Sequence, residues 1–480
     1  MSETARRERT GKWELCCALV VAALWIAPAA ATETTACVDR LASTPDSIDA
    51  AQPRLPELSY ECLQLDSGQS LWVGETPASG LSTVLLVHGL GDIAHRDWRN
   101  VIPALVSRYH VVTVDLPGFG TSPAPAAPFT FDSLAAMLDE TLRRKAVNRA
   151  HVVGHSLGAA LSLHFAYQYP DRVDRLVLVD AAGILQKSVF VRYLTELNVD
   201  ERGAGSAIKK PVNFLSRILR RKLESKFDFA AWLVKHPSVR SSLLGQRTQL
   251  DAGLALVEQN FAPVIRATNA PVTLIWGRDD AIAPLRTGYL LAGSLPDARL
   301  HILDGVGHVP MKESAESFNA LLATALAAPL AARFDTAPAP ASYGDVVCKS
   351  KPNQFYTGHF RSLRLSNCAD ARIENAVVGR LVIKESTVEM MNVSVASKAT
   401  AMTVAGSLVT GTNISLKGVI AIKANSSELD LACATLRATR RAVHMSSGRL
   451  YFSVSDIQSP EYRGDAHFIW QAGYRGNTGR

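Results

Sequence analysis

The sequence predicts an α/β fold, a doubly wound and mostly parallel sheet with a helical cap, followed by a C-terminal all-β domain. Short apolar runs alternate with amphipathic segments between about residues 60 and 185, as in parallel strands covered by helices on both faces. A basic, helix-like insertion then interrupts the pattern, and beyond residue 342 the composition shifts to Ser, Thr, Asn and Val. The chain has 480 residues, 47% of them hydrophobic, which is enough for two folded units with their own cores.

The N-terminus has the pattern of a secretory signal peptide. Basic residues up to Lys12 precede an unbroken apolar run over residues 15–27, and small residues follow, so cleavage is expected after Ala31. The apolar run is shorter than the roughly 20 residues that a membrane span needs, and an uncleaved N-terminal anchor is the alternative. We therefore expect an exported protein, periplasmic or secreted, with residues 1–31 as leader and residues 32–57 as an N-terminal arm.

Five cysteines follow the leader, and export makes disulfide bonds possible. A bond between Cys37 and Cys62 would join the arm to the first strand. A bond between Cys348 and Cys368 would close the start of the C-terminal region and leave Cys433 over. Other pairings stay open, because connectivity cannot be deduced from sequence alone.

The expected parallel strands cover residues 84–87, 111–114, 150–153, 176–179, 272–276 and 299–303, and a helix over about residues 313–327 closes the domain. The insertion at residues 186–262 falls where it would cover the C-terminal ends of the strands as a cap. Its basic residues are interleaved with apolar ones: Lys209, Lys210, Arg217, Arg220, Arg221, Lys222 and Lys226. This pattern favours contact with an anionic membrane surface or an acidic substrate, the alternative being a solvated helix face.

An Ala- and Pro-rich segment, residues 331–342, has the composition of a linker and precedes a β-rich repeat domain at residues 343–480. Four similar segments begin at Val382, Met402, Ala421 and Ala442, about 20 residues apart. Short strands at this period favour a parallel β-helix, in which each coil packs only on its neighbours. An antiparallel sandwich would also contain short strands and is the alternative.

The strongest chemical signal is Gly154-His155-Ser156-Leu157-Gly158, which matches G-x-S-x-G between an expected strand and an expected helix. A sharp turn at this point projects the serine hydroxyl out of the sheet, and the N–H of Leu157 points at the carbonyl group under attack. A second N–H, that of Leu90 in the loop after an earlier strand, would complete an oxyanion hole. We expect His88 in that loop to be structural.

A serine at its ordinary pKa needs a base that is held by an acid. Because this arrangement runs Ser, then acid, then His along the chain, the acid should end a later strand. Asp280 is the preferred candidate there, with Asp279 in reserve, and His308 follows the last strand as the base. The other histidines lie in or beside regular elements and are expected to serve packing; they are His151, His155, His164 and His301.

Residues 58–330 resemble the α/β-hydrolase superfamily, closest to esterases and to the hydrolases that cleave carbon–carbon bonds of ring-cleavage products. The matching segments are His88-Gly89, Trp98-Arg99, residues 115–122, the motif around Ser156, residues 276–280 with Pro284, and residues 307–310. In that family the acid lies four residues after the tryptophan and four before the proline, so the resemblance implies that Asp280, between Trp276 and Pro284, is the acid. It also implies that residues 186–262 form the cap. Relatives that use aspartate as nucleophile are excluded by Ser156.

These features predict an exported serine hydrolase that cleaves carboxylic esters, lipid esters included, through an acyl-enzyme on Ser156. Carbon–carbon hydrolysis and acyl transfer could use the same three residues. In a different class, the chain could be an envelope or glycan-binding protein with a non-catalytic hydrolase scaffold and a binding C-terminal domain. The sequence contains no metal-ligand cluster or nucleotide motif, so no cofactor is expected, and the net charge of +7 does not indicate nucleic acid.

Overall fold

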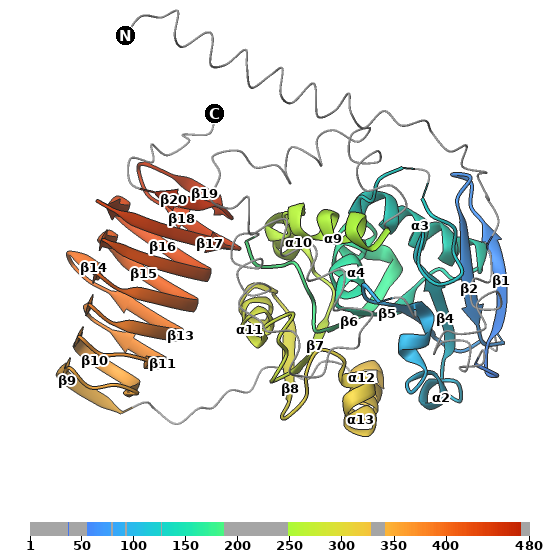
Figure 1. Ribbon diagram of the computed structural model, residues 1–480, viewed down its shortest axis with the longest axis horizontal. Helices are drawn as coiled ribbons and strands as arrows, with labels where there is room; N and C mark the ends of the chain where they lie inside the picture. The colour runs from blue at the N-terminus through green and yellow to red at the C-terminus, as the bar shows by residue number, and fades with distance from the viewer. Residues whose placement is uncertain are drawn as a thin grey trace, which may run out of the picture. The chain divides into compact units, whose positions relative to one another are not determined.

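The computed structural model describes residue 37 and residues 55–77, 80–91, 94–125, 127–186, 248–327 and 341–471 (Figure 1). The predicted leader, most of the arm, most of the cap and most of the linker lie outside the described residues, and the expectations about them stay predictions. Within the described ranges, no helix is long and apolar enough to cross a membrane.

An eight-stranded mixed sheet forms the first domain, in the order β1-β2-β4-β3-β5-β6-β7-β8. Its strands are β1 (Ser59–Gln64), β2 (Ser70–Glu75), β3 (Thr83–Val87), β4 (His110–Asp115), β5 (Ala150–His155), β6 (Val173–Val179), β7 (Val272–Gly277) and β8 (Ala298–Leu303). The β1–β2 and β2–β4 pairs are antiparallel, and all later pairs are parallel. The C-terminal ends of β3 and of β5 to β8 therefore meet at one edge.

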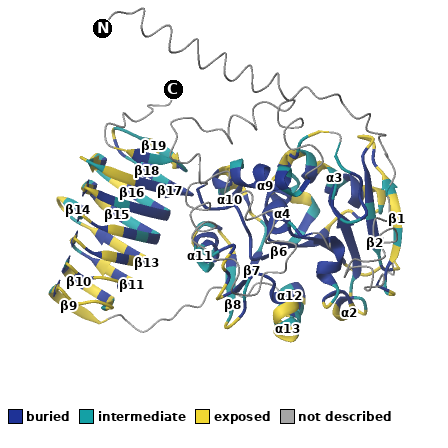
Figure 2. Ribbon diagram, in the orientation of Figure 1, coloured by how far each residue is buried: buried dark blue, intermediate teal, exposed yellow. Residues whose placement is uncertain are grey.

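Helices cover both faces of this sheet, as the alternation of apolar runs predicts. Leu85 and Val87 of β3 belong to one apolar core, whereas Val84 and Leu86 belong to another on the opposite face. In Figure 2 the labelled strands β6 and β7 in the middle of this sheet are mainly buried. The helical elements are η1 (Ala94–Trp98), α2 (Ile102–Leu105), α3 (Phe131–Arg144), α4 (Leu157–Gln168), η2 (Pro170–Arg172), α9 (Thr248–Glu258), α10 (Ala262–Ala267), α11 (Leu285–Ser294), α12 (Pro310–Glu313) and α13 (Ala315–Ala327).

The second domain is all-β and has its own apolar core. Its strands are β9 (Ser342–Lys349), β10 (Phe355–Ser366), β11 (Ala371–Val378), β12 (Leu381–Lys384), β13 (Thr387–Ala396), β14 (Thr400–Ala405), β15 (Leu408–Asn425), β16 (Ser427–Met445), β17 (Gly448–Ser453), β18 (Ser455–Gln458), β19 (Arg463–Ala466) and β20 (Ile469–Gln471). Pairing from β9 to β18 is parallel, and the sheet closes on itself because β13 also pairs with β15. Only the last two strands pair antiparallel to their neighbours.

Successive parallel strands of this domain repeat one register. Val388 pairs with Val409, Val409 with Leu429, and Leu429 with Leu450, each about 20 residues further along the chain. The predicted spacing of the four similar segments is therefore a spacing between paired strands.

Stacked asparagines mark one bend of this repeat. Asn375, Asn392 and Asn413 all have positive φ, which asparagine tolerates better than most residues. The Nδ2 of Asn392 donates to Asn375 Oδ1 at 3.0 Å, and the Nδ2 of Asn413 donates to Asn392 Oδ1 at 3.1 Å. Each side chain therefore satisfies the next, and the bends stay in register.

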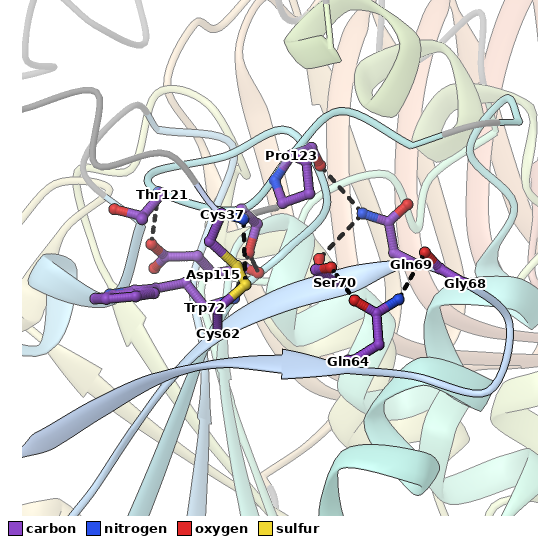
Figure 3. The surroundings of a disulfide bond; sticks show 11 residues. Cys37, Cys62, Gln64, Gly68, Gln69, Ser70, Trp72, Asp115, Thr121 and Pro123 are labelled. Carbon is purple, nitrogen blue, oxygen red and sulfur yellow. Dashed lines mark hydrogen bonds between the residues drawn. A yellow bond between two sulfur atoms is a disulfide. The ribbon is translucent and has the colours of Figure 1, made fainter. Parts of the chain in front are cut away.

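Both predicted disulfide bonds are present. Cys37 is bonded to Cys62 of β1, and Cys348 of β9 is bonded to Cys368, which precedes β11. Figure 3 shows the first of these bonds, with the hydrogen bond from the N–H of Cys37 to the Cys62 sulfur. Among the described residues, Cys433 is the free cysteine, as the pairing predicts.

Candidate active site

Ser156 lies in the tight turn between β5 and α4. Its backbone has φ 52° and ψ −113°, a strained conformation for a residue with a side chain. The turn requires glycine on both sides: a Cβ on Gly154 would lie 2.3 Å from Gly158 O, and a Cβ on Gly158 would lie 2.3 Å from His88 O. The motif thus reflects a close approach of strand, helix and the loop after β3.

Replacing Gly158 by alanine should destabilise the protein by about 3 kcal/mol, because the new methyl group meets backbone atoms that cannot turn aside. Chemical denaturation of the variant measures the loss. Gly305→Ala is the control, since a Cβ there meets nothing within 4 Å and only its positive φ adds strain. A loss at Gly158 no larger than that at Gly305 would contradict the steric account.

The structure brings the three predicted side chains into one hydrogen-bonded chain. The Ser156 hydroxyl is 2.9 Å from His308 Nε2, and His308 Nδ1 is 2.8 Å from Asp280 Oδ2. All three residues are buried, and they come from the turns that follow β5, β7 and β8. Asp279, the reserve candidate, is exposed, and its N–H donates to Val306 O.

The hydrogen bonds fix the tautomer of the imidazole. Asp280 Oδ1 accepts from the N–H groups of Ile282 and Ala283, at 2.7 and 2.9 Å, which orients the carboxylate. Its Oδ2 can then accept only from a protonated Nδ1 of His308, so Nε2 carries the lone pair that accepts from the Ser156 hydroxyl. This arrangement can remove the serine proton during nucleophilic attack.

Two further residues hold the loop of His308, and the sequence did not single them out for this role. Glu313 accepts from the N–H groups of Gly307 and Val309, at 2.7 and 3.0 Å, and His155 Nε2 donates to His308 O at 2.7 Å. Burial, followed by the nearby His308, lowers the pKa of His155 to about 4, so this ring is neutral near pH 7. Glu313 lies in the first turn of α12, where an acidic side chain is favoured near backbone N–H groups. An acidic residue at the start of a helix was therefore the signal in the sequence that could have indicated that Glu313 holds this loop.

Of the two predicted oxyanion donors, Leu157 directly follows Ser156, and Leu90 belongs to a loop that approaches it. Leu157 is the first residue of α4, where N–H groups lack acceptors within the helix. The loop of Leu90 is close as well, because a Cβ on Gly89 would lie 3.2 Å from Ser156 Cβ.

His88 sets the orientation of the peptide between Gly89 and Leu90. Its Nδ1 donates to Gly89 O at 2.7 Å, and its Nε2 accepts from Leu116 N–H at 2.9 Å. Burial lowers the pKa of His88, which keeps the ring neutral as both bonds require. Since a trans peptide directs its C=O and N–H oppositely, the carbonyl bond to His88 turns the Leu90 N–H away from that ring.

Part of the predicted cap is described, namely α9 and the start of α10. Thr248 packs against Gly118: a Cβ added to Gly118 would lie 2.4 Å from the Thr248 methyl group. Asp251 accepts from Phe129 N–H at 2.9 Å. The C-terminal end of the cap is thus fixed to the loops after β4. Among the described residues, no cluster of three His, Cys, Asp or Glu side chains could hold a metal ion.

Comparison with known proteins gives matches to about half of the chain. A family model described as alpha/beta hydrolase fold matches residues 82–315. An uncharacterized protein of Mycobacterium tuberculosis (strain ATCC 25618 / H37Rv) is 30% identical over 249 residues, which cover 49% of this chain and 72% of that protein. A 2-hydroxy-6-oxononadienedioate/2-hydroxy-6-oxononatrienedioate hydrolase of Paraburkholderia phymatum is 30% identical over 264 residues, 51% of this chain and 86% of the enzyme.

Solved structures also align with part of the chain. A hydrolase from Pseudomonas aeruginosa PA01 aligns with a TM-score of 0.44 and 23% sequence identity, covering 57% of this chain and all of that one. The match to the family model ends before the C-terminal domain begins.

Proposed function

Because the chain belongs to the alpha/beta-hydrolase-fold family, we propose that it is a serine hydrolase in which Ser156 attacks the carbonyl carbon of its substrate. The observation that carries the proposal is the buried hydrogen-bonded chain from Ser156 through His308 to Asp280. A nucleophile, a base and a group that orients the base are the minimum that acyl transfer through serine requires.

In the proposed reaction, His308 Nε2 takes the hydroxyl proton as Ser156 Oγ bonds to the carbonyl carbon. The N–H groups of Leu157 and Leu90 then stabilise the negative oxygen, each by about 3 kcal/mol at the transition state. The imidazolium protonates the leaving group, which departs and leaves an acyl-enzyme. Water, activated by the same imidazole, releases the acid and restores the serine.

We propose carboxylic esters, lipid esters included, as the substrate class. The support is the sequence of the cap, whose basic and apolar residues suit surface-active esters, and the predicted leader, which would deliver the protein to the cell envelope. A second candidate is carbon–carbon bond hydrolysis, because a relative of which the chain covers 86% is named 2-hydroxy-6-oxononadienedioate/2-hydroxy-6-oxononatrienedioate hydrolase. Acyl transfer to an alcohol would use the same acyl-enzyme.

For the C-terminal domain we propose a parallel β-helix, supported by the constant register of its parallel pairs and by the stacked asparagines. A glycan or another envelope component is its proposed partner. Binding of residues 343–480 within the whole protein to cell-wall glycans tests this second role separately from catalysis.

The catalytic proposal is tested with a fluorophosphonate probe, which bonds to an activated serine. We expect the wild type to be labelled, and Ser156→Ala to lose labelling and at least about 1,000-fold of esterase activity. Ser162→Ala is the matched control, because Ser162 is also buried but donates to Gly158 O in α4. Folded wild type that takes up no label, or Ser156→Ala that keeps it, would contradict the proposal.

Substrate class is tested with p-nitrophenyl esters of increasing chain length beside a 2-hydroxy-6-oxo dienoic acid. Faster hydrolysis of the longer esters supports the lipid-ester proposal. Preference for the dienoic acid would assign the second candidate instead.

A further inference from the structure

A second buried carboxyl group lies beside the three residues of the proposed mechanism, which does not use it. Asp180 follows β6 directly, is fully buried, and has a positive φ of 45°. Its Oδ1 accepts from Gly277 N–H at 2.9 Å. Its Oδ2 is buried as well, and among the described residues no donor reaches it. An ionised oxygen without a donor in such a place would be costly.

Asp280 lies next to this carboxyl group, because Gly277 links the two residues: its N–H donates to Asp180 Oδ1, and its carbonyl oxygen accepts from Asp280 N–H. Two buried carboxylates side by side repel each other, so one of them holds a proton. Asp280 accepts from three N–H groups, those of Ile282, Ala283 and His308, whereas Asp180 accepts from one. The better solvated group keeps the charge, so the proton belongs to Asp180. Burial, and then the charge of Asp280, raise the pKa of Asp180 well above its usual value.

We propose that Asp180 is a protonated positioning residue, which donates a hydrogen bond from Oδ2 to the Asp280 carboxylate and so holds that carboxylate against His308. This inference rests on the proposed function, because its effect on rate passes through Asp280 and His308. The proton also supplies the one hydrogen bond that Oδ2 lacks, since a carboxylate oxygen can accept but not donate.

The other charged groups around the pair do not supply this bond. Asp280 approaches Asp180 from the turn after β7, and Glu313 approaches from α12. Glu313 is negative and is occupied by the N–H groups of Gly307 and Val309. The Nδ1 proton of His308 is already directed at Oδ2 of Asp280. A proton on Asp180 therefore remains the way to join the two carboxyl groups.

The hydrogen bond should influence the pH at which the enzyme works. A donor to Asp280 withdraws negative charge from it, and an imidazolium at His308 is then stabilised less. The acidic limb of the kcat/KM profile reports protonation of the base in the free enzyme. Removing the donor leaves more negative charge on Asp280, which stabilises the imidazolium, so this limb should shift to higher pH.

Asp180→Asn and Asp180→Leu separate the proton donor from the volume it fills. Asparagine can accept from Gly277 and donate to Asp280, so we expect kcat within about threefold of wild type and an unchanged acidic limb. Leucine cannot donate, so we expect kcat to fall by about 10- to 100-fold and the limb to rise by about half a pH unit or more. Asp279→Asn, an exposed carboxylate nearby, is the control and should change neither.

Infrared difference spectroscopy tests the proton without any need for activity. The wild type at pH 7 should show the absorption of a protonated carboxylic acid, and Asp180→Asn should lack it. Absence of that absorption, or equal losses of kcat in the asparagine and leucine variants, would overturn the inference. So would an acidic limb that stays in place in Asp180→Leu. If Ser156 takes no probe but the absorption is present, the proposed function fails while the carboxyl pair stands.

Discussion

Replacing Asp280 by asparagine should lower kcat by about four orders of magnitude while the protein remains folded. The side-chain amide is similar in size, but it presents an NH₂ group where the carboxylate accepts from His308 Nδ1 at 2.8 Å. To avoid two donors facing each other, the imidazole adopts the other tautomer, with the proton on Nε2. That nitrogen then cannot accept the proton of Ser156. Steady-state kinetics with a p-nitrophenyl ester measures the loss, and circular dichroism checks the fold.

Asp279→Asn is the matched control. It replaces the adjacent carboxylate by an amide and changes the net charge by the same amount as Asp280→Asn. Asp279 is exposed and its N–H donates to Val306 O, so kcat should stay within about twofold. An Asp280→Asn variant that keeps more than a tenth of wild-type activity would assign the acid elsewhere. Asp180, at the end of β6, would then be the residue to replace.

Much of the candidate site could be predicted because each part is encoded locally. The motif at residues 154–158 needs its glycines because backbone atoms of neighbouring segments approach them closely. Asp280 and His308 follow β7 and β8, whose residues are mainly apolar. Such patterns can be recognised in the sequence without knowledge of the tertiary fold. The two disulfide bonds were also predictable, since each joins cysteines that are close in sequence.

Asp180 could not be predicted in its role. In sequence it is an aspartate at the end of an apolar strand, a common place for a solvated residue. Its buried position depends on β7 lying beside β6, which brings Gly277 N–H to within 2.9 Å across almost 100 residues of chain. No local pattern reports that two carboxyl groups meet there.

The repeat of the C-terminal domain was found only where its period is regular. The segments from Val382 onward are 19 to 21 residues apart, whereas Asn375 and Asn392, at equivalent bends, are 17 apart. The earlier strands β9 to β11 therefore escaped the repeat pattern, although they pair in the same parallel manner. The pairing of these strands depends on which side chains along each strand are buried. A bend with fewer residues shortens the repeat but does not change this pattern of burial.

A second large effect is expected on stability, at the ion pair between Arg286 of α11 and Asp430 of β16. The guanidinium contacts both carboxylate oxygens, at 2.6 and 3.0 Å, and also donates to Gly411 O. Both side chains are almost completely buried. Asp430→Ala leaves a buried cation without its carboxylate contacts, so we expect a loss of about 3 to 5 kcal/mol in the free energy of unfolding.

Urea denaturation of Asp430→Ala, Arg286→Met and the double variant Arg286→Met/Asp430→Leu measures this effect as a cycle. The double variant should be more stable than either single one, because it removes both desolvated charges and fills the space with apolar groups. The control is Arg361→Ala, which removes an exposed ion pair to Asp345 and should leave the midpoint unchanged. Additive losses in the double variant would mean that the two charges act independently. Coupled losses would instead mean that α11, which begins shortly after Asp280, is held by the β-rich domain, so that domain would support the acid of the candidate site.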